Sequence, residues 1–204
     1  MTINTLAWNR FRYTLYTPIY DLIVKILVHS RKQSIESLSI RPNDKILIVG
    51  AGTGFDLEFL RTDCHIIATD ITPSMVKRIK KRAKLVNPQA QAIVMNGQAL
   101  DFPDASFDIV ILHLILAVIP DPLACIKEVD RVLKVGGQVA VFDKFVPKNR
   151  AVSHRRRIAN HITNFFFSDI TRDIYWLIKQ TSLKVDFDIP ANFKGNFRRI
   201  KLVK

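Results

Sequence analysis

Residues 45–55 read K-I-L-I-V-G-A-G-T-G-F, and this stretch decides the fold of the chain. Its apolar run, 46–49, ends in three glycines at alternate positions, Gly50, Gly52 and Gly54. A second apolar run, 66–68, leads to Asp70, twenty residues after the first glycine. This order predicts a strand, a tight glycine turn, a helix and a second strand with a carboxylate at its carboxyl end. Nucleotide-like ligands bind at this place in an open α/β sheet.

The spacing of the glycines separates two classes of cofactor. A dinucleotide site favours G-x-G-x-x-G, but the third glycine position of that motif is Phe55 here. The pattern G-x-G-x-G instead resembles the first motif of class I S-adenosylmethionine-dependent methyltransferases. The resemblance implies that the turn lies under the methionine part of S-adenosylmethionine and that Asp70 holds both ribose hydroxyls, because a carboxylate accepts two hydrogen bonds at once. The alternative is a glycine-rich turn that serves the fold alone.

Composition and charge limit the classes of partner. A chain of 204 residues suits one domain, so we expect a single methyltransferase domain with a helical cap over 1–40 and a cofactor-binding α/β core over 41–204. The 31 basic and 18 acidic residues give a formal net charge of +13, which favours nucleic acid, an anionic membrane face or an acidic small molecule. Cys64 and Cys125 form no C-x-x-C motif, so neither a metal site nor a disulfide framework is expected.

The location of the protein is inferred from its cysteines and apolar runs. The cysteine usage indicates a reducing, intracellular compartment, and the N-terminus lacks the pattern of a signal peptide. The longest apolar run, 109–119, contains His113 and is too short to span a bilayer. We expect a cytoplasmic protein, either free or peripheral on the inner membrane face.

Predicted strands and helices alternate along the rest of the chain. The predicted strands are 45–49, 65–69, 92–96, 107–112, 138–143, 184–189 and 197–203. The predicted helices are 5–29, 30–39, 56–61, 72–85, Pro120 to about 135, and one or two within 149–180. Strands that alternate with helices indicate a parallel sheet covered on both faces, which the last two strands close at one edge. We therefore expect a Rossmann-like α/β fold with a mostly parallel seven-stranded sheet and an N-terminal helical cap.

Later landmarks continue the resemblance and narrow it to the methyltransferase-11 type. Residues 96–103 stand where that family carries G-D-A-x-x-L-P-F, residues 106–108 match its S-F-D, and residues 133–137 match its L-K-P-G-G turn. Gln98 replaces the family's usual acid beside the adenine, where an amide oxygen can still accept from the adenine amine. The resemblance, which covers 45–143, implies these cofactor-binding residues: Gly50, Ala51, Gly52, Thr53, Gly54, Asp70, Ile71, Met75, Gly97, Gln98, Ala99, Leu100 and His113.

A narrower similarity points to bacterial phosphatidylethanolamine N-methyltransferases. It rests on residues 99–108, on His113, on residues 118–120 and on the aromatic stretch Y-T-P-I-Y-D at 16–21. In that family the N-terminal helix is amphipathic, binds anionic lipid and folds over the active site. Quinone-pathway C-methyltransferases share several of these landmarks. The resemblance implies a lipid or lipid-like acceptor, with the amine of phosphatidylethanolamine as one candidate, and a soluble small molecule or quinone precursor as the alternative.

The candidate catalytic residues are His113, Tyr16 and Tyr20. Methyl transfer needs alignment and exclusion of water rather than a nucleophilic side chain or a metal ion. His113 follows a predicted strand and can relay a proton, or it is a satisfied histidine packed at the strand end. Tyr16 and Tyr20 share one helical face and can hold a substrate cation over a ring, or they pack within the helix. Asp143 faces the same crevice or a turn, and Asp56 more simply caps a helix.

The basic residues fall into three clusters with two interpretations. The cluster at 77–84 lies on the same predicted helix as an apolar stripe and is typical of a solvated outer face. The stripe consists of Met75, Val76, Ile79 and Ala83. The clusters at 148–157 and 198–204 accompany the aromatic run 165–167, which suits an anionic membrane surface, or those aromatics are core residues. A nucleic-acid methyltransferase is disfavoured, because 119–122 is not an N-P-P-Y or D-P-P-Y motif. A non-catalytic binding protein with the same fold is the remaining hypothesis.

Overall fold

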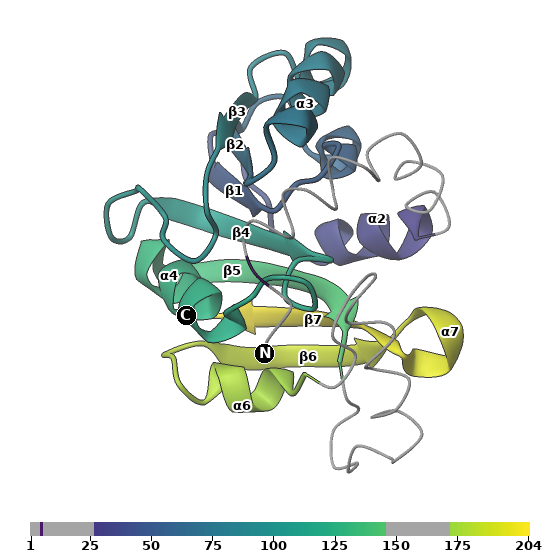
Figure 1. The fold of residues 1–204 in the computed structure, drawn as a ribbon, viewed down its shortest axis with the longest axis vertical. Coiled ribbons are helices and arrows are strands. Elements are labelled where there is room, and N and C mark those ends of the chain that lie inside the picture. The colour runs from purple at the N-terminus through teal and green to yellow at the C-terminus, as the bar shows by residue number, and fades with distance from the viewer. Residues whose placement is uncertain (1–4, 6–26, 146–171) are drawn as a thin grey trace.

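A seven-stranded sheet forms the centre of the molecule (Figure 1). The computed structural model describes Thr5 and residues 27–145 and 172–204. The strand order is β3-β2-β1-β4-β5-β7-β6. The strands are β1 (Lys45–Val49), β2 (His65–Asp70), β3 (Gln91–Val94), β4 (Phe107–His113), β5 (Leu133–Lys144), β6 (Lys184–Pro190) and β7 (Phe197–Val203). Strands β1 to β5 pair in parallel, while β7 is antiparallel to β5 and β6. This confirms the predicted mostly parallel sheet.

Helices cover both faces of the sheet, as predicted. They are α2 (Val28–Glu36), the 3₁₀ helix η1 (Phe55–Phe59), α3 (Pro73–Val86), α4 (Pro122–Val132), α6 (Ile174–Ile178) and α7 (Asn192–Gly195). One core cluster joins α4 and α6 to one face, and a second joins α2, η1 and α3 to the other. Within the described part of the chain, none of these helices has the length and apolar character needed to cross a bilayer.

The element boundaries differ from the predicted ones in two informative places. The helix after the glycine turn is a short 3₁₀ helix rather than an α-helix. Helix α4 ends at Val132, and β5 begins at Leu133, although the sequence predicted that this helix continues to about residue 135. The reason is tertiary: Leu133 pairs with Phe107 in the sheet and is fully buried there. Most of the predicted helix 5–29 and of the segment 149–180 lies outside the described residues.

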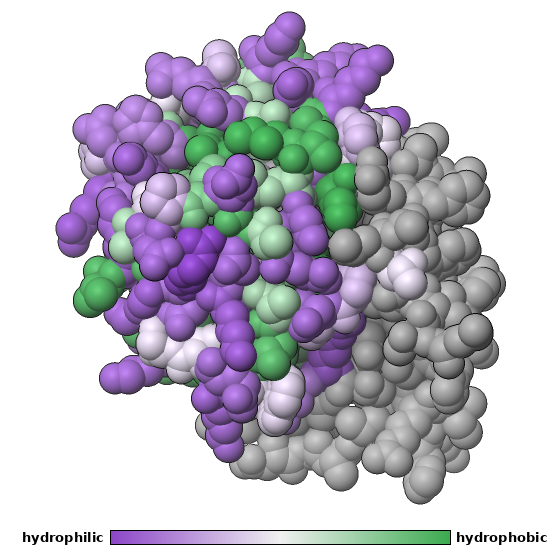
Figure 2. Space-filling view, turned by 60° about the vertical axis from the view of Figure 1, so that its left-hand side comes forward, coloured by the Kyte–Doolittle hydropathy of each residue, from purple (hydrophilic) through white to green (hydrophobic). Residues whose placement is uncertain are grey.

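Helix α3 carries the predicted division into a buried and a solvated face. Its buried side chains are Met75, Val76, Ile79 and Ala83. Lys77, Lys80, Lys81 and Lys84 are exposed. In Figure 2 hydrophilic residues cover much of the displayed face, and hydrophobic residues gather in its upper part. The interpretation as a solvated outer face is confirmed for these four lysines, whereas Arg82 of the same cluster is half-buried and pairs with Glu58.

The glycine turn between β1 and η1 is built from left-handed backbone. Gly50, Gly52 and Gly54 have φ angles of 67°, 58° and 82°, which side chains with a Cβ adopt only at a cost. The Ala51 N–H donates to the Thr69 carbonyl at 2.8 Å, which fastens the turn to the end of β2. The turn and Asp70 therefore meet at the carboxyl edge of the sheet.

Candidate functional site

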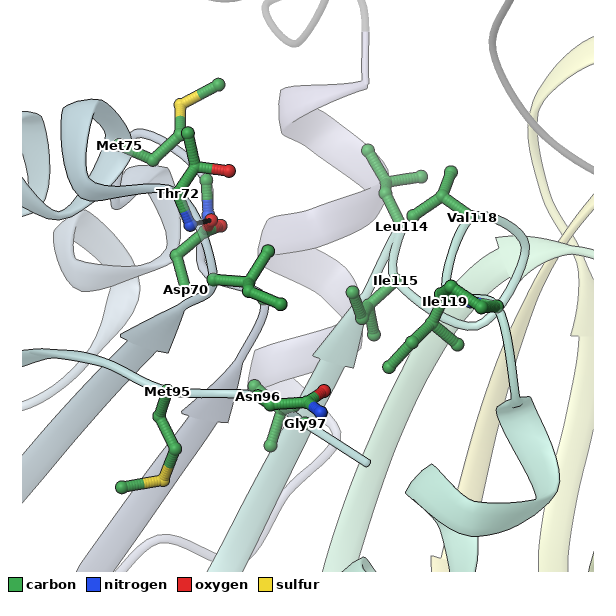
Figure 3. A pocket seen from close by; sticks show the side chains of 15 residues that line it. Asp70, Thr72, Met75, Met95, Asn96, Gly97, Leu114, Ile115, Val118 and Ile119 are labelled. Carbon is green, nitrogen blue, oxygen red and sulfur yellow. Dashed lines mark hydrogen bonds between the residues drawn. The ribbon is translucent and has the colours of Figure 1, made fainter. Parts of the chain in front are cut away.

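A cleft with about 630 Å³ of empty space opens at the carboxyl ends of β1, β2 and β4 (Figure 3). Asp70, Thr72 and Met75 lie on one side of it, with Leu114, Ile115, Val118 and Ile119 opposite and Met95, Asn96 and Gly97 beside them. The lining is completed by Val49, Gly50, Gly52, Ile71 and Pro120. Among the described residues that line it, Asp70 is the one ionisable side chain. A mostly apolar cleft with one carboxylate and exposed backbone groups suits a small organic ligand.

Asp70 is held in place by two backbone groups. Its Oδ2 accepts from the Gly52 N–H and its Oδ1 from the Thr72 N–H, both at 2.9 Å. The residue is 9% exposed. Burial raises the pKa of Asp70 to about 6, although the two N–H donors favour the charged form. Each carboxylate oxygen keeps a further lone pair, so the group can accept hydroxyl hydrogen bonds from a ligand.

The glycines allow other groups to approach the main chain closely. A Cβ on Gly50 would lie 2.5 Å from Ile115 Cδ1, so the loop 114–120 packs directly on the turn. A Cβ on Gly97 would lie 2.6 Å from Val49 Cγ1. Both contacts are far shorter than side chains tolerate, so these two positions set the width of the cleft.

The structure brings only part of the predicted cofactor set to the cleft wall. Gly50, Gly52, Asp70, Ile71, Met75 and Gly97 line it. Ala51, Thr53 and Gly54 lie behind the wall; the Thr53 carbonyl accepts from Arg82 and the Gly54 N–H donates to Ala51. Leu100 is buried in the core, and Ala99 is exposed.

Gln98 has a different partner from the one predicted for it. Its Oε1 accepts from the Asp121 N–H at 2.8 Å, and Asp121 in turn caps α4 through the Ala124 N–H at 2.9 Å. Gln98 is not among the lining residues. In this structure its amide oxygen therefore fastens the residues 97–100 to the start of α4, rather than facing the cleft.

His113 points away from the cleft. Its Nδ1 lies 2.9 Å from Asp56 Oδ1 and its Nε2 lies 3.0 Å from Ser34 Oγ, and the residue is 2% exposed. The side chain thus matches the alternative that the sequence left open, a satisfied histidine packed at the strand end. Asp56, expected to cap a helix, binds His113 and Arg31 instead.

The remaining predicted groups lie behind the cleft or outside the described residues. Asp143 is 1% exposed, and its two carboxylate oxygens accept from the Ala117 and Lys144 N–H groups, both at 2.8 Å. It therefore anchors the loop 114–120, and burial raises its pKa to about 6. The following predicted groups lie outside the described residues: Tyr16, Tyr20, the basic cluster 148–157 and the aromatic run 165–167.

Nine of the lining residues were not predicted as site residues, and four of these form the apolar wall opposite Asp70. Leu114, Ile115, Val118 and Ile119 follow the end of β4, directly opposite Asp70 (Figure 3). Leu114 has a φ of 61°, uncommon for a bulky residue, and its N–H donates to the Phe142 carbonyl at 2.8 Å. Their position after a predicted parallel strand is the signal that could have identified them.

Comparisons with known proteins agree with this geometry. The family described as Methyltransferase domain matches residues 47–141. The chain is 28% identical over 130 residues to a phosphatidylethanolamine N-methyltransferase of Cereibacter sphaeroides, covering 62% of this chain and 64% of that one. It is 32% identical over 142 residues to the ubiquinone/menaquinone biosynthesis C-methyltransferase UbiE of Shewanella frigidimarina, covering 64% of this chain and 56% of that one. The alignments thus span less than two thirds of either relative.

The fold is shared with solved structures. Geranyl diphosphate C-methyltransferase of Streptomyces coelicolor, crystallised with Mg²⁺, geranyl diphosphate and S-adenosyl-L-homocysteine, superimposes with a TM-score of 0.70 at 13% identity. The match covers 85% of this chain and 78% of that one. The sheet order, the G-x-G-x-G turn beside Asp70 and the matched domain lead to one conclusion. Residues 47–141 match the methyltransferase domain family, and the chain has the fold of the class I S-adenosylmethionine-dependent methyltransferases.

Proposed function

We propose that this protein transfers a methyl group from S-adenosylmethionine to an apolar, lipid-like acceptor. One observation carries the cofactor assignment: the cleft wall joins side-chain-free backbone at Gly50 and Gly52 to the buried carboxylate of Asp70. This combination fits a nucleoside, because the ribose hydroxyls need an acceptor and the flat glycine backbone leaves room beside it. When bound, the cofactor supplies a methyl group that its sulfonium charge already activates.

The residues of this chain would hold the cofactor and exclude water. Asp70 would accept the ribose hydroxyls, and the backbone of Gly50 and Gly52 would lie beside the cofactor. Leu114, Ile115 and Val118 form an apolar wall opposite, which removes water from the reacting groups. Such a wall aligns an acceptor by shape and adds no competing nucleophile. Tyr16 and Tyr20 stay predictions as catalytic residues, whereas both ring nitrogens of His113 contact Asp56 and Ser34 and its side chain does not line the cleft.

The proposed methyl acceptor is a membrane lipid, and the group that would be methylated is the amine of phosphatidylethanolamine. The apolar wall, the formal charge of +13 and the similarity to a phosphatidylethanolamine N-methyltransferase support it. The similarity to a quinone C-methyltransferase favours a quinone precursor as the second candidate, since an isoprenoid chain suits the same wall. With a lipid acceptor, the protein would work as a cytoplasmic single domain that contacts the anionic membrane face peripherally.

The pKa of Asp70 makes cofactor binding depend on pH. The carboxylate is ionised above its pKa of about 6, and this form accepts hydroxyl hydrogen bonds more strongly than the protonated form because it is charged and both of its oxygens only accept. We expect the dissociation constant of S-adenosylhomocysteine to rise by up to about tenfold for each pH unit below 6, with release of a proton from Asp70 on binding. Calorimetry between pH 4.5 and 7.5 in two buffers of different ionisation enthalpy measures both effects. In Asp70→Asn the profile should be flat; an equally steep profile there would assign the titration to another group.

A partition experiment tests the acceptor. Protein and S-adenosylmethionine labelled in its methyl group are incubated with vesicles of phosphatidylethanolamine and phosphatidylglycerol, and separately with a quinone-precursor lipid extract. The proposal expects label in the organic phase, on the amine headgroup. This label should appear with the wild-type protein and be reduced with the cleft variant Asp70→Ala. Label on the quinone lipid instead would establish the second candidate. Label confined to the aqueous phase of a whole-cell extract would contradict both lipid acceptors and favour a soluble small molecule.

A further inference from the structure

A buried polar cluster contacts the elements that carry the cleft walls, but none of its residues lines the cleft. We call Arg31, Ser34, Asp56 and His113 the Asp56 cluster. Arg31 Nε donates to Asp56 Oδ1 at 2.9 Å and Arg31 Nη2 to Asp56 Oδ2 at 2.7 Å. The four residues are 1–2% exposed. Burying an ion pair so completely costs desolvation free energy that can exceed the attraction between the charges. The pair is therefore weak evidence for a stabilising role, and a positioning role is considered instead.

The protonation states in the cluster follow from its geometry. Although burial raises it, the pKa of Asp56 lies below its ordinary value, because Arg31 and His113 stabilise the carboxylate. An ionised carboxylate only accepts, so His113 Nδ1 carries the proton and donates to it. Burial lowers the pKa of His113, so the ring is neutral and its Nε2 accepts from the Ser34 hydroxyl. The cluster is therefore charge-balanced, and each of these bonds has a defined direction.

The cluster joins the two walls of the cleft. Asp56 lies in η1, two residues after Gly54, at the end of the glycine turn. His113 is the last residue of β4, and Leu114 and Ile115 of the opposite wall follow it directly. Arg31 and Ser34 come from α2, which packs against η1 and β5. One carboxylate thus links the cofactor turn, the start of the apolar wall and α2.

We propose that Asp56 and His113 are positioning residues that fix the separation between the glycine turn and the Leu114–Ile119 wall. This inference rests on the proposed function, because the spacing of the two walls matters only if a cofactor and an acceptor bind between them. Ile115 already packs where a Gly50 Cβ would be, so a small shift of either wall changes the cleft. Neither residue lines the cleft, so they act through Gly54 and Leu114 and touch no reacting atom.

Two measurements on matched variants test the proposal. In His113→Leu we expect about a tenfold or larger increase in the dissociation constant of S-adenosylhomocysteine, because misplacing a binding wall by a fraction of an ångström weakens many contacts together. In the free protein, hydrogen exchange should become faster at the amides of 50–57 and 114–119. His113→Asn should restore most of the affinity, because its amide nitrogen can donate to Asp56 in place of Nδ1. Ser34→Ala, which removes only the outer bond, should have an effect of less than about threefold.

Two controls separate positioning from general stability. Asn87 is fully buried at the end of α3 and donates to the Arg61 carbonyl at 3.1 Å, away from the cleft. Asn87→Ala should lower the melting temperature while leaving the affinity and the exchange of 50–57 and 114–119 unchanged. The triple variant Arg31→Met, Asp56→Leu, His113→Phe replaces the charges with apolar groups and should recover the melting temperature but not the affinity.

The results that would overturn the proposal are specific. It fails if His113→Leu keeps wild-type exchange rates at 50–57 and 114–119, or if the apolar triple variant recovers affinity together with melting temperature. It also fails if Asn87→Ala loses as much affinity as His113→Leu. A wild-type protein that does not bind S-adenosylhomocysteine would refute the proposed function instead, and the exchange rates of the free protein would then decide the positioning role independently.

Discussion

Replacing Asp70 with alanine is expected to raise the dissociation constant of S-adenosylhomocysteine about 100-fold. A carboxylate that accepts two ribose hydroxyls contributes about 1.5 kcal/mol through each bond, and a difference of 2.7–3 kcal/mol corresponds to about two orders of magnitude. The substitution also leaves the Gly52 and Thr72 N–H groups without their present acceptor, so the turn itself loosens. Calorimetric titration of the two proteins measures the effect, with far-ultraviolet circular dichroism to establish that both are folded.

The matched control for this variant is Asp108→Ala. Asp108 also accepts from a backbone N–H, that of Lys45 at 2.9 Å, and from Lys134 Nζ at 2.6 Å, but it lies near the amino ends of β1 and β4. It should cost some stability and leave the affinity unchanged. Unchanged affinity in Asp70→Ala, or an equal loss in both variants, would contradict the assignment of Asp70 as the ribose acceptor.

Gly50→Ala is expected to weaken S-adenosylhomocysteine binding by about 10- to 100-fold and to destabilise the fold. The φ of 67° costs a residue with a Cβ about 1–2 kcal/mol. The new methyl group would also lie 2.5 Å from Ile115 Cδ1, and overpacking of this kind costs about 1–3 kcal/mol. Ile115 must shift to relieve the contact, and because both residues line the cleft, this shift changes its shape. Titration and thermal unfolding measure the two effects.

Two further variants separate the backbone cost from the steric one. Gly136 has a φ of 78° and nothing within 4 Å of the place a Cβ would take. Gly136→Ala should therefore lose stability through the backbone alone and keep full affinity. Gly50→Ala with Ile115→Ala removes the two shortest contacts, to Cδ1 and Cγ1, but keeps the φ cost and the 3.0 Å approach of residue 115 Cβ, so its melting temperature should lie between those of wild type and Gly50→Ala. If Gly136→Ala lost affinity as Gly50→Ala does, the loss would reflect stability and not the cleft.

Much of the fold and the centre of the site could be predicted from local pattern. The apolar run 46–49, the alternate glycines and Asp70 determine a strand, a left-handed turn and a carboxylate at one sheet edge, because periodicity and steric limits act over a few residues. The two final strands were predicted for the same reason. The glycines and Asp70 line the cleft together, since parallel strands end at the same edge.

Side-chain direction was decided by contacts that are distant in sequence. His113 turns toward Asp56 and Ser34, which are 57 and 79 residues away, and Gln98 gives its oxygen to the Asp121 N–H. The end of α4 at Val132 follows from the pairing of Leu133 with Phe107. These partners come within hydrogen-bonding distance only after the chain has folded. The local sequence pattern therefore does not reveal them.

The sequence by itself therefore determined the architecture of the sheet, the glycine turn and the carboxylate beside it. Only the tertiary structure decided which wall faces that carboxylate, and that His113 lies beneath the cleft rather than in it. The physical reason is that backbone conformation depends on neighbouring residues. The burial of a charged or polar side chain depends instead on which distant partner can satisfy it.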